Sequence, residues 1–521
     1  MIGDEELIAG RPVAEVCVDL PARLSHKILK WVELTPEAIA LQEEGRRWSY
    51  AEFGQAIEAA KLHLTEHNVR AGDRIMLVGE NSCALLAFLM AVSELDAWVA
   101  IINARLSARE IDAIREDCDP RHLIYTAECS AESTTHATRH EAEFEDHALL
   151  GRFAFKGPFE TTAEPVFSKS EDQVFAMIYT SGTTGTPKGV MLTHRNIGFI
   201  ATVSGALRGL SATDRVYAVL PISHIFGFAS TAMGTLFTGG MLYLAPRFNA
   251  ECCLNTLKEE KITVLQGVPA MFTALIELQK SRGERASELS LRYMSCGGAP
   301  LDPDTKKMTE EFFGLTLNNG YGLTEASPTI TQTRISEPQQ NCSTGRPLPG
   351  VEVRLMNIDG TEVTNSDIGE LWVRGPNIMK GYFRKPEQTA EVVDADGWLN
   401  TQDLAQVDDE GNVTIVGRTK EMIVRSGFNV YPAEVEAVLN AHPDITHSAV
   451  IGKEINGDET VLAFVQPAIG SKLTAEDLKA YCKKMLTPYK CPSKFTLMPQ
   501  LPATATGKIL KSSLKELDIQ L

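Results

Sequence analysis

The residues best suited to chemistry lie in one short segment, Thr180–Gly189, with the sequence TSGTTGTPKG. Its glycines let backbone N–H groups approach an anion, its hydroxyls donate further hydrogen bonds, and Lys188 supplies a positive charge. An apolar strand, Val174–Tyr179, leads directly into it. It is not a Walker A loop, because Pro187 precedes the lysine and Gly189 follows it. We predict a phosphate-binding loop of another type, and the alternative is a surface turn without a ligand.

The same segment resembles the signature of the adenylate-forming superfamily. That superfamily includes acyl-CoA synthetases, aryl-CoA ligases, luciferases and the adenylation domains of peptide synthetases. Its pattern is a strand followed by Ser/Thr-Ser-Gly-Ser/Thr-Ser/Thr-Gly-x-Pro-Lys-Gly, which Thr180–Gly189 matches throughout. The resemblance extends over nearly the whole chain. It implies that the phosphates of ATP are bound by Thr180, Ser181, Gly182, Thr183, Thr184, Gly185 and Lys188.

Two segments in the middle of the chain agree with this resemblance. Pro221–Gly227 resembles the family's gate between acyl pocket and nucleotide, with His224 at the gate position. Taken alone, His224 would be interpreted as a hydrogen-bonded core histidine. Ser295–Leu301 resembles the turn whose backbone packs on adenine. The resemblance adds these nucleotide contacts: Gly298, Ala299, Pro300, Gly320 and Gly322.

Asn319–Glu325 contains the sequence YGLTE, which is similar to the family's YGxTE motif. By that resemblance Tyr321 stacks on adenine, Thr324 bonds the α-phosphate and Glu325 ligates Mg²⁺. A carboxylate is a hard oxygen ligand of the kind that Mg²⁺ prefers. The sequence thus implies a metal site at Glu325.

Three more positions near the C-terminus carry the family's pattern. Asp403 stands where relatives have the aspartate that binds the ribose hydroxyls, although the neighbouring Gln402 replaces the usual glycine. Arg418 is expected to contact ribose or phosphate, and Lys420 takes the hinge position. Lys508 ends a segment similar to the family's PxxxxGK and is implied to approach the carboxylate and α-phosphate. Alone, it would be interpreted as a surface lysine.

The resemblance implies an acyl-CoA synthetase that adenylates a carboxylic acid with ATP and Mg²⁺ and then transfers the acyl group to coenzyme A, releasing AMP and pyrophosphate. The CoA contacts are Ser426, Gly427 and Phe428. The walls of the acyl pocket carry no acid or strong base, which favours an apolar fatty or aromatic acid. These walls are His224, Phe228, Val268, Cys296, Gly297, Gly320 and Leu323.

Other function classes remain as alternatives. The first is a stand-alone adenylation enzyme that loads an acyl or amino acid onto a carrier protein, but Ile225–Phe228 offers no aspartate for an amine. An aminoacyl-tRNA synthetase is disfavoured by the net charge of −18, from 68 acidic residues against 50 Lys and Arg, which repels nucleic acid. A non-catalytic nucleotide-binding module is the third.

Composition indicates the cellular setting. The N-terminus lacks the basic residues of a signal peptide, and the longest apolar run, Ala84–Val92, is too short to span a bilayer. The ten cysteines form no CxxC pair and no histidine cluster accompanies them, so we expect reduced thiols and no zinc site. We predict a cytoplasmic protein, monomeric or homodimeric, without membrane or nucleic-acid partners.

The elements that position these residues follow from hydrophobic periodicity. Ala51–His67 has the spacing of an amphipathic helix, and short apolar strands at Asp73–Val78 and Trp98–Ile102 alternate with helices, which indicates an α/β fold with largely parallel sheets. Residues from about 340 to 419 predict a β-rich subdomain. We expect an N-terminal adenylation domain over 1–419, built from two α/β sheet subdomains and the β-rich one. A mobile α+β lid follows over 420–521, with the hinge at Lys420.

Overall fold

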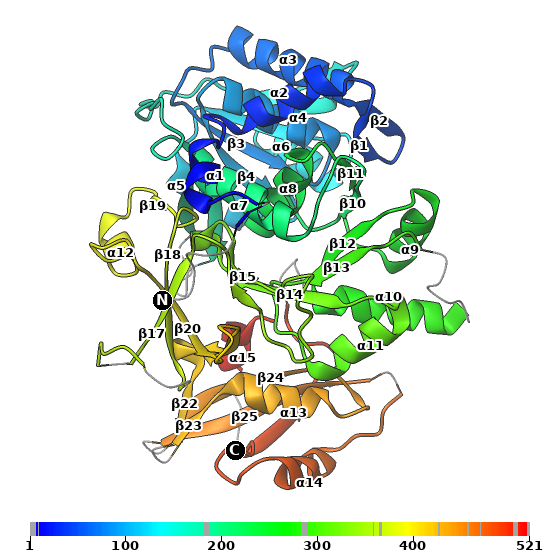
Figure 1. Ribbon diagram of the computed structural model, residues 1–521, viewed down its shortest axis with the longest axis vertical. Helices are drawn as coiled ribbons and strands as arrows, with labels where there is room; N and C mark the ends of the chain where they lie inside the picture. Colours follow the sequence, from blue (N-terminus) through cyan, green and yellow to red (C-terminus); the bar gives the residue numbers. More distant parts are fainter. Residues whose placement is uncertain are drawn as a thin grey trace.

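The architecture comes from a computed structural model that describes residues 7–8, 10–181, 187–282, 289–357, 359–363, 367–425, 428–455, 458–468, 470–503 and 509–517. Two large sheets with helices on their faces form the N-terminal part (Figure 1). The C-terminal segments lie at the end of the long axis opposite α3 (Tyr50–Glu66). The predicted α/β class with a separate small C-terminal part is therefore confirmed.

The first sheet has eight strands and holds the phosphate segment at one edge. Its order is β19-β9-β8-β4-β3-β5-β7-β6. The central pairs β3·β4, β3·β5 and β4·β8 are parallel, whereas the outer pairs are antiparallel. The sheet is thus less parallel than predicted, because the β6–β7 hairpin closes one edge and the antiparallel strands β9 and β19 extend the other. The strands are β3 (Arg74–Gly79), β4 (Trp98–Asn103), β5 (His122–Thr126), β6 (Glu143–His147), β7 (Gly151–Lys156), β8 (Val174–Ser181), β9 (Pro187–Thr193) and β19 (Gly381–Tyr382).

The second sheet has nine strands in the order β16-β15-β14-β13-β12-β10-β11-β1-β2. Its centre is parallel, and β2, β15 and β16 are antiparallel additions. The strands are β1 (Ile39–Glu43), β2 (Arg46–Ser49), β10 (Arg215–Ala218), β11 (Met241–Leu244), β12 (Val264–Gly267), β13 (Tyr293–Cys296), β14 (Leu317–Gly322), β15 (Thr329–Gln332) and β16 (Arg346–Pro347).

Helices join the two sheets into one core. The helix α4 (Cys83–Glu94) is apolar on all sides and contacts β4 of one sheet and β1 of the other. The helix α3 begins at a capping box of Ser49 and Glu52, which satisfies its first free N–H groups. The other helices of this part are α1 (Val13–Val18), α2 (Leu24–Leu34), α5 (Ala108–Cys118), α6 (Ala131–Arg139), α7 (His194–Leu207), the π-helix η1 (Phe226–Met233), α8 (Gly234–Leu236), α9 (Ala250–Glu259), α10 (Pro269–Arg282), α11 (Pro303–Phe313), η3 (Thr324–Ala326) and α12 (Pro386–Ala390).

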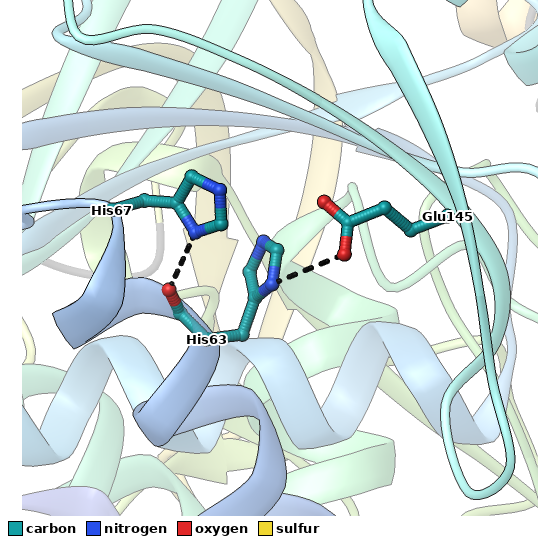
Figure 2. Close-up of side chains that lie close together, drawn as sticks. All are labelled: His63, His67 and Glu145. Atoms are coloured by element: carbon teal, nitrogen blue, oxygen red, sulfur yellow. Dashed lines mark hydrogen bonds and ion pairs between the residues drawn. The ribbon is translucent and has the colours of Figure 1, made fainter.

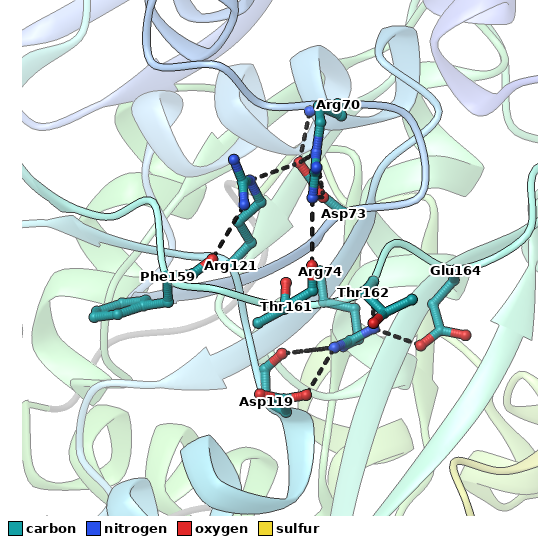
Figure 3. A network of polar contacts seen from close by, with 9 residues as sticks. All are labelled: Arg70, Asp73, Arg74, Asp119, Arg121, Phe159, Thr161, Thr162 and Glu164. Atoms are coloured by element: carbon teal, nitrogen blue, oxygen red, sulfur yellow. Dashed lines mark hydrogen bonds and ion pairs between the residues drawn. The ribbon is translucent and has the colours of Figure 1, made fainter.

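A buried arginine network closes the first sheet against the segment that follows β7 (Figure 3). The Arg74 side chain is 0% exposed and donates to the Asp119 carboxylate at 3.0 Å and also to Glu164. The adjacent Asp73 carboxylate lies 3.2 Å from Arg121 Nε. A buried guanidinium without such partners would be strongly destabilising, so these contacts hold the loop in place.

After the large sheets the chain forms smaller ones. A four-stranded antiparallel sheet, β17-β18-β20-β21, is the predicted β-rich part, and the short η4 (Thr419–Glu421) follows it. Helical periodicity predicts helices at Ala433–Leu439 and Ala475–Met485. The structure has α13 (Pro432–Asn440) and α14 (Ala475–Met485) there. The remaining elements are β17 (Glu352–Met356), β18 (Gly369–Arg374), β20 (Leu399–Val407), β21 (Val413–Arg418), β22 (Ile423–Arg425), β23 (Phe428–Val430), β24 (Ile445–Ile455), β25 (Asp458–Pro467), β26 (Lys494–Leu497) and α15 (Lys511–Lys515).

None of the helices within the described ranges has both the length and the apolar character that a membrane crossing requires.

Candidate active site

The phosphate segment joins two antiparallel strands at the edge of the first sheet. Thr180 pairs with Lys188 and Ser181 with Pro187, so β8 and β9 extend further into the motif than the sequence predicts. Pro187 is tolerated because it is the first residue of its strand. The predicted ligands Gly182, Thr183, Thr184 and Gly185, and the Ser181 side chain, lie outside the described residues.

Tyr382, which belongs to none of the sequence motifs, contacts both Lys188 and Glu325. The Tyr382 hydroxyl donates to Glu325 Oε1 at 2.8 Å, and Lys188 Nζ lies 4.9 Å from the centroid of the Tyr382 ring. Burial, and then the nearby Glu325 carboxylate, raise the pKa of Tyr382, so its hydroxyl is protonated and donates at neutral pH. The lysine over the ring face makes a cation–π contact. A predicted phosphate ligand and a predicted metal ligand therefore share one neighbour.

The backbone around Glu325 is held from the same direction. Met379 N donates to Glu325 O at 2.9 Å, and the buried Asn377 side chain donates to Ala326 O at 3.2 Å. Both donors belong to the segment that leads into β19, which pairs with β9. The Glu325 turn is thus tied through backbone and side-chain bonds to the strand that carries Lys188.

We predict that Tyr382→Phe lowers the apparent affinity for Mg²⁺–ATP about 10-fold, because outer partners of a metal ligand typically contribute that much. The variant keeps the ring under Lys188 and removes only the hydroxyl. Steady-state rates over a Mg²⁺ titration measure the effect. The matched control is Tyr50→Phe, which removes a hydrogen bond of 2.9 Å to Gly240 O at the start of α3, away from Lys188 and Glu325. An unchanged Mg²⁺ dependence in Tyr382→Phe contradicts the prediction.

A second cluster joins Tyr321, Asp403 and Arg418. The Tyr321 hydroxyl donates to Asp403 Oδ2, and Arg418 Nε lies 3.1 Å from Asp403 Oδ1. Burial opposes the charge of Arg418, but Asp403, Glu421 and Tyr321, with Glu325, outweigh it and raise the pKa of the guanidinium. Tyr321 lies at the end of β14 and Glu325 in the η3 that follows it, so the two clusters are neighbours in one site.

The turn before Asp403 has Gln402 at the position where the family resemblance predicts glycine. Gln402 has φ 58°, in the left-handed region that favours glycine, and its N–H donates to Asn400 Oδ1 at 2.7 Å. A non-glycine residue there costs roughly 1–2 kcal/mol. The Asp403 N–H donates to the Thr401 hydroxyl at 3.1 Å, which also holds this turn.

The gate segment is positioned by Asn81, which belongs to none of the motifs in the sequence. Its buried side chain donates to Ala218 O and Leu220 O at 3.0 Å each, and Ile222 N donates to its carbonyl oxygen at 2.8 Å. A single amide thereby fixes the chain just before His224. The His224 side chain is exposed, and its Nδ1 accepts from Phe226 N at 3.2 Å, so the core-histidine interpretation is wrong.

Phe226, Gly297 and Gly320 meet beside the gate. A Cβ on Gly297 would lie 3.3 Å from Gly320 O and 3.4 Å from Phe226 Cε1. The half-buried Val268 lies close to Gly298, at 3.8 Å from the corresponding Cβ position there. Phe226 is a neighbour of the predicted pocket that the sequence analysis did not include.

Two predicted pocket residues are buried, and a third is half-buried. Phe228 is fully buried, and its ring stacks on the ring of Phe175 with 5.9 Å between the centroids. It lies two residues beyond Phe226 in the helix, so its side chain points to another side. Cys296 is buried, with Sγ 3.7 Å from Asn319 Oδ1. Leu323 is half-buried and begins the turn that carries the buried Thr324. The preceding Gly322 must be glycine, because a Cβ there would lie 1.8 Å from Pro328 O.

The remaining predicted site residues divide into exposed and undescribed ones. Ala299, Pro300 and the hinge residue Lys420 are exposed. Lys508, Ser426 and Gly427, and the Phe428 side chain, lie outside the described residues.

The arrangement offers a cation, a carboxylate, an aromatic ring and an Asp–Arg pair around one region. These groups match the needs of an anionic nucleotide: positive charge for phosphates, an oxygen ligand for a hard metal ion, and a carboxylate that accepts from sugar hydroxyls. In the described part of the chain, the site is formed by β9, β14, β19, β20 and β21, together with η3.

Comparison with known proteins gives this geometry its context. Residues 28–383 match the family model "AMP-binding enzyme", and residues 434–508 match "AMP-binding enzyme C-terminal domain". The chain is 34% identical over 488 residues to a feruloyl-CoA synthase from Amycolatopsis sp, covering 92% of this chain and 96% of that protein. It is 31% identical to 4-coumarate–CoA ligase-like 2 from Arabidopsis thaliana, covering 91% and 86%.

A solved structure agrees over the same extent. The o-succinylbenzoate CoA synthetase MenE from Bacillus subtilis, in complex with ATP and magnesium ion, superposes with a TM-score of 0.80 at 29% identity, covering 94% of this chain and 99% of that one.

Proposed function

Because the chain belongs to the AMP-binding enzyme family, we propose that it is an ATP-dependent CoA ligase for an apolar carboxylic acid. The family and the reaction class follow from the match over both parts of the chain and from CoA-ligase relatives above 30% identity. The observation that carries the assignment of the site is the meeting of Lys188 and Glu325 at Tyr382.

The enzyme is an AMP-forming acid–thiol ligase. The substrate carboxylate attacks the α-phosphorus of ATP, pyrophosphate leaves, and an acyl-adenylate forms. The CoA thiol then attacks the acyl carbon and AMP leaves, giving the thioester. The first step replaces an oxide leaving group with AMP, and its catalysis consists chiefly of positioning and of neutralising spread negative charge.

Each residue of the site has a proposed part in these steps. Lys188 and the hydroxyls of Thr180–Thr184 bind phosphate oxygens, and Asp403 accepts from the ribose hydroxyls with Arg418 beside it. Tyr321 packs on adenine, and its bond to Asp403 supports this by keeping the ring beside the ribose position. Lys508 supplies charge to the carboxylate and α-phosphate.

The Glu325 carboxylate suits a magnesium ion bound with ATP. Its Oε1 accepts from Tyr382, and among the described residues no donor bonds to Oε2, so one hard oxygen remains for the ion. When bound, Mg²⁺ neutralises phosphate charge during nucleotide binding.

The acid bound beside the gate is proposed to be apolar. Phe226, Gly297, Gly320 and Val268 bring neither an acid nor a base to this region, and glycine at 297 lets Phe226 and Gly320 pack closely there. The feruloyl and 4-coumarate relatives act, by their names, on phenolic acids. We place aromatic acids ahead of fatty acids for this enzyme.

We predict that Gly297→Val lowers kcat/KM for bulky aromatic acids about 10- to 200-fold and changes it little for acetate, because the added side chain presses on Phe226 and moves that ring into space that only the larger acid uses. Gly297→Ala should lie between the two. The KM for ATP, which binds on the other side of the gate, serves as the internal control. Equal losses for both acids contradict the proposed pocket.

The direct test of the function is a panel of aromatic, fatty and dicarboxylic acids with ATP, Mg²⁺ and CoA, followed by AMP release and thioester detection. Turnover with aromatic acids supports the proposal. Pyrophosphate release without thioester formation would instead favour the alternative, an enzyme that loads a carrier protein.

The two half-reactions need different surroundings, which we propose the C-terminal part supplies by rotating about Lys420. Lys511 lies 2.8 Å from both Glu421, next to that position, and Glu436 of α13. This link ties the region after Lys508 to the hinge. The same proposal places the domain boundary between residues 419 and 420. It also includes CoA contacts by Ser426, Gly427 and Phe428, and a cytoplasmic enzyme that is a monomer or a homodimer.

A further inference from the structure

Two histidines and a glutamate meet at the edge of the first sheet farthest from the active site (Figure 2). His63 lies in the last turn of α3, His67 follows its end, and Glu145 lies on the edge strand β6. One ligand atom from each residue lies within 4.8 Å of the others. Residues four apart on a helix share one face, so α3 presents both imidazoles together.

The contact between His63 and Glu145 is not a well-formed hydrogen-bonded ion pair. His63 Nε2 is buried and has no hydrogen-bond partner among the described residues. Its Nδ1 lies 3.5 Å from Glu145 Oε2, too long for a good hydrogen bond. A cation held between the imidazole and the carboxylate would bind both groups.

His67 is already oriented as a ligand. Its Nδ1 lies 2.8 Å from the carbonyl oxygen of His63, so donation to that oxygen leaves the lone pair on Nε2. Histidines that bind metals usually donate their other ring N–H to a carbonyl or carboxylate in this way. In Figure 2 the other ring nitrogen of His67 lies on the side of Glu145.

The solvent access of Glu145 and the packing around His63 are also compatible with ion binding. The Glu145 side chain is 40% exposed, which gives an ion a path from solvent. The His63 side chain is 11% exposed and is held edge-on by Phe153 at 5.0 Å and Phe155 at 5.1 Å. One ligand is therefore fixed by packing, and the others close over it with small side-chain rotations.

We propose that His63, His67 and Glu145 bind a divalent transition-metal ion of the zinc class, with water at the open position. Two imidazoles and a carboxylate form a donor set that Zn²⁺ accepts readily and Mg²⁺ does not prefer. The expectation of no zinc site, drawn from the cysteines, overlooked this histidine pair. The ion joins the end of α3 to β6, across the sheet from Lys188 and Tyr382, so it acts on the stability of this edge rather than on ATP binding.

The test uses the full-length enzyme after dialysis against a chelator. Titration with Zn²⁺ in a calorimeter should show one site per chain, and Zn²⁺ should raise the midpoint of thermal unfolding. His67→Gln and Glu145→Gln should each weaken binding at least about 10-fold and remove most of the thermal shift. Both replace side chains that are partly exposed, so the fold is retained. The control, His26→Gln, removes a histidine that lies 3.8 Å from Glu94 on another element and should bind Zn²⁺ like the wild type.

Cobalt gives a second readout that does not depend on stability. Co²⁺ bound by these donors should absorb in the visible range in the wild type and in His26→Gln, but not in His67→Gln. Equal Zn²⁺ binding by all four proteins, or no binding by the wild type, overturns the proposal, and neither result bears on the ligase activity.

Discussion

Replacing Lys508 by alanine is expected to slow acyl-adenylate formation about 10²- to 10³-fold, because removing one preorganised donor to a developing charge typically has that effect. Thioester formation from presynthesised acyl-adenylate should be much less affected, since the proposed mechanism gives the lysine no part in the thiol step. Pyrophosphate release and thioester formation, measured separately, give the two rates.

The contrast between the half-reactions carries the information in this experiment. Lys515→Ala is the matched control, because Lys515 is an exposed lysine of α15 close in sequence to Lys508. It should leave both rates unchanged. An equal loss in both half-reactions of Lys508→Ala would refute a role confined to adenylation.

Glu325→Gln is expected to produce the second large effect, a rise of at least about 10-fold in the Mg²⁺ concentration needed for half-maximal adenylation. The amide keeps the shape of the side chain and can still accept from Tyr382, but it lacks the charge that draws a hard cation. The measurement is the adenylation rate over a Mg²⁺ series at fixed ATP.

A glutamate outside the site provides the comparison. Glu337 is exposed and pairs with Arg346 at 2.9 Å, so Glu337→Gln makes the same chemical change away from Lys188 and Tyr382. If Glu325→Gln needs no more Mg²⁺ than Glu337→Gln, Glu325 is not the metal ligand.

Much of the fold could be predicted because its signals are local. The helix α14 begins and ends at the residues that periodicity indicates, and β3 and β4 lie within one residue of their predicted bounds. The strand directions at the sheet edges were harder to predict from the sequence. Whether β9 runs antiparallel to β8 depends on partners such as β19, which lie far along the chain.

The site divides in the same way. Lys188, Glu325 and Asp403 could be identified as chemical groups from motifs, and the family matches support the reaction class that those motifs imply. Tyr382 and Asn81 could not, because a lone tyrosine or asparagine has many ordinary places in a protein. Each acquires its part from a partner distant in sequence: Glu325 is 57 residues from Tyr382, and Ile222 is 141 residues from Asn81.

What the amino-acid sequence determined by itself was the reaction class, the order of the motifs and the main helices and strands, because these reside in residue types and short spacings. The tertiary structure alone decided that Lys188 and Glu325 share Tyr382, that Asn81 sets the gate, and that His63 faces Glu145. Such contacts arise when sheets stack and their edges close, and no short stretch of sequence contains the distances that result.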